Sequence, residues 1–342
     1  MSNNVPKKTR LKKILASASD KRIWIVGDIM LDQFIWGRVS RISPEAPVPI
    51  VDFDCEGFMP GGAANVAKNI VALKGEVELA GVVGRDPAGQ ILKKVMIPAR
   101  IGLGGIISST RRPTTNKMRI VVGHQQVVRV DRENRNEIDS ETVQKLLRRL
   151  KNEISRIDGI IIADYGKGVV TQLLIDGIRQ ICHGSGCWIS LDPKPVHSLD
   201  ISGLSLITPN RKETFELAGI SDTQCATNPL NDRPLLEAVR KIRITKRPSI
   251  LLVTLGELGM LLCQQDCQPI HIPTVARNVF DVSGAGDTVI AVFTLAVVSG
   301  ASPIEAAVLA NQAAGVVVGK RGTSTVRPKE IIDSLSEYDI KW

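Results

Sequence analysis

The sequence is poor in aromatic residues and lacks long apolar runs. Phe, Trp and Tyr make up 4% of its 342 residues, so it has no supply of aromatic platforms on which single-stranded nucleic acid could stack. Its apolar runs fall well short of the roughly 20 residues of a membrane-spanning helix. No zinc-finger or basic-zipper pattern occurs either. These absences predict a soluble, cytoplasmic protein that spans no membrane and binds no nucleic acid.

The cysteines and histidines do not have the spacing of a zinc site. The six cysteines contain no CxxC pair, and the four histidines are scattered. We expect reduced cysteines that mostly serve packing, with Cys182 and Cys187 as the pair most open to another role. Internal repeats and low-complexity linkers are also missing.

What the sequence does have is a positive charge and enough apolar residues for a core. Hydrophobic residues reach 43% and the formal net charge is +9. A basic globular protein can bind nucleic acid, a membrane or small phosphorylated molecules. The basic run at 7–13 is followed by only three apolar residues, too few for a secretory signal. We therefore interpret residues 1–20 as a solvated basic arm and 21–342 as the folded domain.

Short apolar strands alternate with amphipathic helices along most of the chain. Strands are expected at 22–28, 77–84, 159–168, 187–195 and 204–213, a hairpin at 249–263, and helices at 63–75, 141–157, 171–186, 285–299, 303–318 and 327–337. This order predicts an α/β fold with a mainly parallel sheet covered on both faces. Ligands of such sheets bind beyond the carboxyl ends of the strands, where Asp28, Asp164, Asp192 and Asn210 fall.

Two β-rich inserts, about 36–54 and 110–133, interrupt this alternation. Prolines in the first insert confine it to edge strands. We expect the inserts to form a small β-sheet that covers the site as a lid. Exposed strand edges invite pairing with another chain.

The octapeptide DVSGAGDT at 281–288 opens a long apolar helix. The first amides of a helix have no partner within it, and small residues at Gly284, Ala285 and Gly286 let an anion approach them. Asp287 follows, and its carboxylate could accept a proton from a substrate hydroxyl. Amides for a transferring anion beside a base are what phosphoryl transfer requires. An ordinary, tightly packed helix start would give the same residues.

Two further motifs leave alternatives open. The stretch PGGAANVAKN at 60–69 is a second small-residue loop entering a helix, and it carries Asn65; close helix–sheet packing would also explain it. The stretch TPNRKE at 208–213 offers Asn210 and Glu213 for a hydrated Mg²⁺. A capping box would use the same two residues.

Together and in this order, PGGAANVA, TPNRKE and DVSGAGDT resemble the motifs of the ribokinase-like (PfkB) sugar kinases, from about residue 20 to 335. The resemblance implies a ribokinase-like three-layer sandwich with a β-sheet lid, and ATP and Mg²⁺ as cofactors. It makes Asp287 the catalytic base. It also implies that the amides of Gly284, Ala285 and Gly286 stabilise the negative charge that develops on the γ-phosphate. A non-catalytic sugar or nucleotide sensor could keep the fold, but it would need no base.

The resemblance also assigns binding residues. On the ATP side it implies Asn210, Arg211, Lys212, Glu213, Thr254, Gly256, Gly259 and Asn311, with Asn210 and Glu213 organising Mg²⁺ largely through water. On the sugar side it implies Asp28, Asp32, Gly61, Gly62 and Asn65. For Asp28, a loop-capping carboxylate is the alternative. For Gly256, the alternative is a simple hairpin turn, and for Asn311 it is an ordinary amide on a helix surface.

A narrower similarity points to a substrate. GDIMLDQFIWGRVSRISPEAPVPIV at 27–51 is similar to the start of bacterial heptose kinases of lipopolysaccharide assembly, as are ADYGKG, LDPK and AAGVVVGKRGTSTV. These enzymes phosphorylate D-glycero-β-D-manno-heptose 7-phosphate at O1. The stretch at 96–106 fits less well, and we expect it on a peripheral helix and loop. Another sugar kinase, acting on fructose, ribose or a nucleoside, is the alternative.

The heptose substrate needs a cationic contact for its 7-phosphate. The candidates are Arg41, Lys117, Arg119, Arg129 and Lys167, of which we favour Lys117, Arg119 and Lys167. Solvated strand faces or structural ion pairs would also explain them. We further expect a homodimer through the lid. Bifunctional members carry a nucleotidyltransferase domain, and we expect this chain to be the stand-alone kinase.

Overall fold

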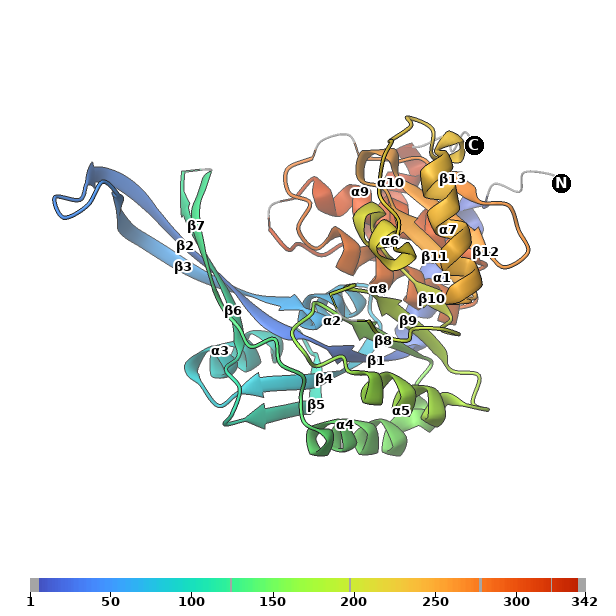
Figure 1. The fold of residues 1–342 in the computed structure, drawn as a ribbon, viewed down its shortest axis with the longest axis horizontal. Helices are drawn as coiled ribbons and strands as arrows, with labels where there is room; N and C mark the ends of the chain where they lie inside the picture. Colours follow the sequence, from blue (N-terminus) through green and yellow to red (C-terminus); the bar gives the residue numbers. More distant parts are fainter. Residues whose placement is uncertain (1–5, 124, 197, 277–278, 321, 338–342) are drawn as a thin grey trace.

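Two β-sheets and the helices around the larger one make up the computed structural model of this chain (Figure 1). It describes residues 6–337 except 124, 197, 277–278 and 321. The main sheet has nine strands in the order β13-β12-β11-β10-β9-β8-β1-β4-β5. The strands β11, β10, β9, β8, β1, β4 and β5 are parallel to one another, and β12 is antiparallel to both β11 and β13.

The strands of the main sheet match most of the expected positions. Their bounds are β1 Arg22–Gly27, β4 Glu76–Gly84, β5 Gly102–Ser109, β8 Gly159–Ala163, β9 Trp188–Asp192, β10 Leu206–Ile207, β11 Ile250–Thr254, β12 Met260–Gln264 and β13 Ile270–Ile272. Side chains alternate between the two faces, so that Ile23 and Ile25 of β1 join one core while Trp24 and Val26 join the other.

Helices cover both faces of the main sheet, as expected of a parallel sheet. One face packs against α1 Lys8–Ala16, α2 Ala63–Ala72, α3 Pro87–Met96, α8 Ala285–Val298, α9 Pro303–Val318 and α10 Pro328–Glu337. The other packs against α4 Ser140–Glu153, α5 Gln172–Cys182, α6 Arg211–Ala218 and α7 Arg233–Thr245. The α/β sandwich predicted from the sequence is confirmed.

The second sheet is the expected lid, and its order is β3-β2-β6-β7. It consists of β2 Ile29–Ile42, β3 Pro49–Gly62, β6 Thr115–Val122 and β7 Gln125–Arg132. It projects away from the body of the molecule, with the turn between β2 and β3 at its far end (Figure 1). One residue, Asp28, lies between the end of β1 and the start of β2 and joins the two sheets.

Two sequence expectations are wrong. Residues 8–16 are not a frayed arm but the helix α1, which buries Leu11, Ile14 and Leu15 against the core because these side chains share one face. The stretch at 96–106 was expected on a peripheral helix and loop. Met96 ends α3 and a turn follows it, as expected, but residues 102–106 belong to β5, which completes the main sheet beside β4. Among the described residues, no helix combines the length and the apolar character needed to cross a membrane.

Candidate active site

Helix α8 begins with an open first turn at the carboxyl edge of the main sheet. Its N-cap Gly284 has φ +80°, a left-handed conformation that glycine adopts without strain. A Cβ atom there would lie 2.7 Å from Nδ2 of Asn65, so any side chain would push into the site. The N–H of Ala285 donates to the carbonyl of Val282 at 3.2 Å. Of the predicted anion-binding amides, those of Gly284 and Gly286 are therefore better placed than that of Ala285.

Asp287 lies in this first turn, and its side chain is held from two other elements. Nδ2 of Asn65, from α2, donates to Oδ2 at 2.5 Å. The hydroxyl of Tyr165, which follows β8, donates to Oδ1. Burial raises the pKa of Asp287, whereas the hydrogen bonds from Tyr165 and Asn65 act in the opposite direction. The carboxylate is thus oriented, as a general base must be.

The root of the lid contributes Asp32 and the basic residues opposite it. Nη1 of Arg119 donates to Oδ1 of Asp32 at 2.6 Å, and the guanidinium lies 5.2 Å from the centre of the Phe34 ring. Lys117 faces Asp32 across the β2–β6 register. Gly61 leaves room for Asp32, because a Cβ there would lie 2.4 Å from Oδ2.

Lys117, Arg119 and Lys167 form a group of three cations, which we call the basic cluster. Burial lowers the pKa of Lys117, and the charges of Lys167 and Arg119 lower it further while Asp32 acts against them. Lys167 pairs with Glu133 at 2.8 Å. Cations kept together in this way are suited to binding an anion.

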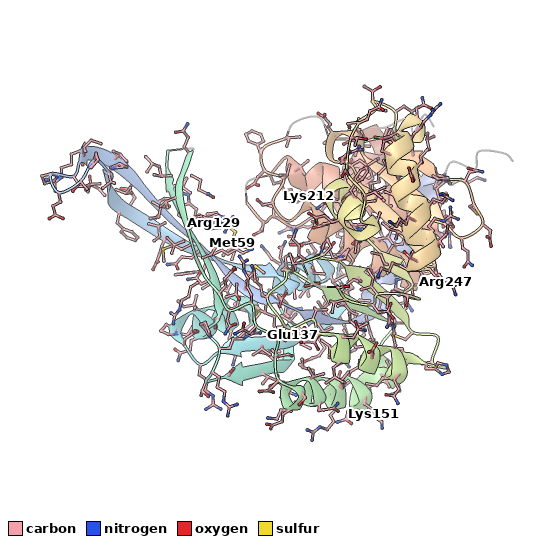
Figure 2. The ribbon with its side chains drawn as sticks, viewed as in Figure 1. Met59, Arg129, Glu137, Lys151, Lys212 and Arg247 are labelled. Carbon is pink, nitrogen blue, oxygen red and sulfur yellow. The ribbon has the colours of Figure 1, made fainter. Side chains whose placement is uncertain are left out.

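The lid face and the main body border an open cavity of about 780 Å³. Phe34, Trp36 and Arg119 line it from the lid, and Phe280 and Thr323 line it from the body. Met59 and Arg129 both lie along the lid strands (Figure 2). The cavity is large enough for a small ligand.

Asp28 differs from its predicted role as a sugar ligand. Its carboxylate is buried and accepts the backbone N–H groups of Tyr165, Lys167 and Val169 at 2.9 to 3.0 Å. The loop-capping alternative describes this geometry. Gly62 takes φ +57° beside the carbonyl of Asp28, where a Cβ would clash at 2.4 Å.

Two further carboxylates stand at the carboxyl ends of β8 and β9. Burial raises the pKa of Asp164 to about 7. Burial also raises the pKa of Asp192, together with the charges of Asp287 and Glu213. Oδ2 of Asp192 lies 3.9 Å from the position of a Cβ on Gly286, so this acid stands beside the open turn of α8.

The predicted Mg²⁺ pair forms a closed capping box at the start of α6. The side chain of Asn210 accepts the N–H of Glu213, and Oε2 of Glu213 accepts the N–H of Asn210, both at 3.0 Å. Oε1 of Glu213 accepts from Lys194 at 2.8 Å. Within the described residues, no three His, Cys, Asp or Glu side chains are grouped as a direct metal site. Any Mg²⁺ at this pair would be held through water.

The other residues predicted on the ATP side are only partly brought together. The backbones of Asn210 and Thr254 pair in an isolated parallel β-bridge, so these two residues lie side by side. Arg211 is occupied by Asp222 and Asp232. Of the remaining predicted residues, Lys212 is exposed, Gly256 and Gly259 flank the turn into β12, and the amide of Asn311 donates to the carbonyl of Pro273 at 2.8 Å.

Sequence reasoning missed Tyr165. The motif ADYGKG was noted for Asp164 and Lys167, and the tyrosine between them was not singled out. Its hydroxyl reaches a residue 122 positions later in the chain. The available signal was its place at a strand exit, where ligand-binding side chains of such sheets gather.

Comparison with known proteins decides the family. The model of the family described as "pfkB family carbohydrate kinase" matches residues 20–330. The chain belongs to this family of carbohydrate kinases. The membership confirms the predicted enzyme class, an ATP-dependent sugar kinase.

Individual proteins are similar to this chain over nearly its whole length. It is 41% identical to "Bifunctional protein HldE" of Geobacter metallireducens and 40% identical to that of Desulfatibacillum aliphaticivorans, in each case over 95% of this chain and 65% of the relative. The chain therefore spans less than two thirds of these relatives, and its stand-alone character stays a prediction.

Solved structures share the fold. Arabidopsis thaliana ribokinase complexed with ribose and ATP has a TM-score of 0.72 at 18% identity, covering 92% of this chain and 98% of that one. Escherichia coli phosphofructokinase-2 in complex with potassium has 0.74 at 19% identity, covering 93% and 99%. The ribokinase-like fold expected from the sequence is confirmed.

Proposed function

We propose that this chain transfers the γ-phosphoryl group of ATP to O1 of D-glycero-β-D-manno-heptose 7-phosphate, a step toward ADP-heptose and lipopolysaccharide core. The observation that carries the proposal is the basic cluster at the root of the lid, within electrostatic reach of the base. Lys117 acts on the charge of Asp287 as well as on that of Asp32. A sugar without a phosphate would not need three cations there.

In the proposed reaction, Asp287 accepts the proton of the anomeric hydroxyl. Proton loss can be late, because the transition state of phosphoryl transfer is loose. Asp32 and Asn65 would hold sugar hydroxyls, since a buried carboxylate and a buried amide oxygen both accept hydrogen bonds. The Oδ1 atom of Asn65 has no hydrogen-bond partner in the described part of the chain. Amides of Gly284 and Gly286 would stabilise charge on the transferring group.

Mg²⁺, when bound, would neutralise charge on the phosphates of ATP. Both oxygens of Glu213 are engaged by Asn210 and Lys194, so a direct bond from Glu213 does not fit. A hydrated ion next to exposed Asn210 does fit, since Mg²⁺ keeps most of its waters. Lys212, Thr254, Gly256, Gly259 and Asn311 would then border ATP, whereas Arg211 serves the α6 region itself.

We also propose a homodimer through the lid, and a cytoplasmic site of action where ATP is available. Strands β3 and β7 are the edges of the lid sheet. The lid also carries exposed apolar side chains, among them Phe53 and Val130. Exposed edges and apolar residues both favour pairing with a second copy. The folded domain would span 21–342 together with helix α1.

A coupled ATPase assay over a panel of sugars tests the substrate. We expect turnover with the heptose 7-phosphate that exceeds turnover with ribose, fructose or nucleosides. Turnover of one of those sugars, with none of the heptose phosphate, would leave the family intact and remove the proposed substrate. A chain that binds sugar and ATP but transfers nothing would be a sensor, against which the oriented Asp287 argues.

Arg119→Ala tests the phosphate contact. We expect the KM for heptose 7-phosphate to rise about 10-fold or more, because a charge-assisted hydrogen bond is lost. The KM for the dephosphorylated heptose should change much less. Arg41→Ala is the matched control, since Arg41 is exposed near the far end of β2. Equal losses for both sugars in Arg119→Ala would refute the contact.

A further inference from the structure

The carboxylate of Asp287 is fixed by hydrogen bonds to both of its oxygens. Asn65 occupies Oδ2 and Tyr165 occupies Oδ1. Each carboxylate oxygen has two lone pairs, so either can still accept a substrate proton. The rotation of the carboxylate, however, is set by its two donors. Asn65 stands on a buried helix, whereas Tyr165 stands on a loop.

The loop that carries Tyr165, residues 164–169, is tied down on one side by Asp28. That carboxylate accepts the N–H groups of Tyr165, Lys167 and Val169. Asp164 accepts the N–H of Gly166, which has φ +65°. The path of the loop is therefore determined at almost every residue, and so is the position of the phenol.

On its other side the same loop is joined to the end of the lid. Nζ of Lys167 pairs with Glu133, the first residue after β7, at 2.8 Å. The N–H of Ile138 donates to the carbonyl of Gly168 at 2.9 Å. The guanidinium of Arg112, in the segment leading into β6, donates to the carbonyl of Asn136. A Cβ on Gly168 would lie 3.0 Å from Nη2 of Arg112, so the segments that enter and leave the lid hairpin both lie against this loop.

We propose that Tyr165 is a positioning residue for the base Asp287, and that its loop transmits the placement of the lid to that base. The proposal rests on the assignment of Asp287 as base in the proposed function. When the lid holds a substrate, the Lys167–Glu133 pair keeps the loop in place and the phenol keeps Oδ1 oriented. When the pair is broken, the loop loses its anchor on the lid side, and the phenol holds Oδ1 less firmly.

The groups around Asp287 determine in which direction its pKa should move when Tyr165 is changed. The hydrogen bonds from Tyr165 and Asn65 lower the pKa of Asp287, which burial raises. Other charges face it from neighbouring elements. Asp32 on β2 raises the pKa, Lys117 on β6 lowers it, and the carboxyl of Asp192 at the end of β9 interacts with it. Removing the phenol hydroxyl takes away a lowering contribution, so the base should titrate at higher pH.

Tyr165→Phe is the decisive variant, because it removes one hydroxyl and keeps the ring. With whichever sugar the wild-type enzyme phosphorylates, we expect the acid-side midpoint of kcat/KM to move up by about one pH unit. The same shift should appear in the NMR titration of the Asp287 carboxyl carbon, assigned with Asp287→Asn, whether or not any sugar is turned over. Unchanged midpoints in both measurements would overturn the proposal.

Glu133→Gln tests the link to the lid. We expect a smaller upward shift of the same midpoint, because the loop that carries Tyr165 loses its anchor on the lid and the phenol holds Oδ1 of Asp287 less firmly. Glu137→Gln is the matched control, since Glu137 is exposed in the segment that follows Glu133 (Figure 2), and it should leave the midpoint unchanged. Equal midpoints for the two variants would refute the link. If the wild-type enzyme phosphorylates no sugar in the panel, the proposed function fails, and the NMR midpoints still decide the role of Tyr165.

Discussion

Helices α6 and α8 both begin at the carboxyl edge of the main sheet, yet their first turns are in opposite states. At α6 the side chains of Asn210 and Glu213 satisfy each other's backbone N–H groups. At α8 the N-cap is Gly284, which brings no capping side chain. The first turn of α6 is complete by itself, whereas that of α8 keeps amides for a ligand.

The carboxylates at the starts of α6 and α8 also differ in how far their surroundings satisfy them. Glu213 of α6 is neutralised by Lys194 at 2.8 Å. Around α8, burial raises the pKa values of Asp287, Asp192 and Asp164. Similar motifs in a sequence can therefore mark one helix turn that stabilises the fold and another that serves the reaction. The second kind is recognised by what it leaves unsatisfied.

The largest effect is expected from Asp287→Asn. Turnover should fall by about 10³-fold or more, because both the charge and the proton acceptor are lost. ATP binding, measured by calorimetry, should be retained, since the amides of the open turn remain. A variant that works at nearly the wild-type rate would show that the open turn of α8 does not carry the base.

Gly284→Ala should come next. The added Cβ would lie 2.7 Å from Asn65 in a residue with φ +80°, so Asn65 must move away from Asp287. We expect kcat to fall by about 10²-fold, as for loss of an oriented donor. Gly300→Ala is the matched control at the other end of α8, because it has φ +88° with nothing within 4 Å of its Cβ. Its unfolding free energy should fall by about 1–2 kcal/mol, with kcat retained. Equal kcat values for the two variants would contradict the argument.

Asp164→Asn sharpens the contrast in charge. Because burial raises the pKa of Asp164 to about 7 from an ordinary value of 3.8, this residue stabilises the fold at low pH. That stabilisation is lost as the pH rises through about 7. The free energy of unfolding of the wild-type protein, measured with urea between pH 4 and 8, should therefore fall more steeply with pH than that of Asp164→Asn, by about 4 kcal/mol over the range. Parallel curves would mean that Asp164 titrates normally.

The smallest effect tests the closed turn of α6. Asn210→Ala should cost about 1 kcal/mol of unfolding free energy, as loss of an N-cap does. Ser302→Ala is the matched control, because Ser302 and Glu305 form the same capping box at α9. Both variants should unfold at similarly lower urea concentrations, and only Asn210→Ala should raise the Mg²⁺ concentration needed for half-maximal activity. If the Mg²⁺ concentration needed for half-maximal activity rose equally in both variants, the change would follow from lost stability and not from Mg²⁺ binding at Asn210.

The parts of this fold that could be predicted from the sequence are those with local signals. Periodic apolar residues predict most strands of the main sheet and the helices α8 and α9. Helix α1 was missed because its basic residues conceal the apolar stripe of Leu11, Ile14 and Leu15. Strand β5 was missed because its sequence, GLGGIISS, is rich in glycine, which is uncommon in strands.

The parts of the site that were missed depend on long-range contacts. The motif GAGD marks the open turn from sequence alone. The contact of Tyr165 with Asp287 spans 122 positions, and the N–H donors that occupy the carboxylate of Asp28 lie 137 to 141 positions away from it. Pattern reasoning places such residues at the same edge of a sheet. It does not say which of them face the cavity and which face one another.

The junction at Asp28 gives the lid a mechanical property. The N–H of Asp28 donates to the carbonyl of Ala163, and its own carbonyl accepts from Ala63, at 3.1 and 3.0 Å. Strand β2 continues from this anchored residue for 14 residues, which at roughly 3.3 Å per residue makes an arm of about 45 Å. A rotation of about 10° at the anchor would swing the far end by about 8 Å on such an arm. A small change of backbone angle at this one residue is therefore amplified along β2 into a displacement of the far end of the lid that is larger than a side chain.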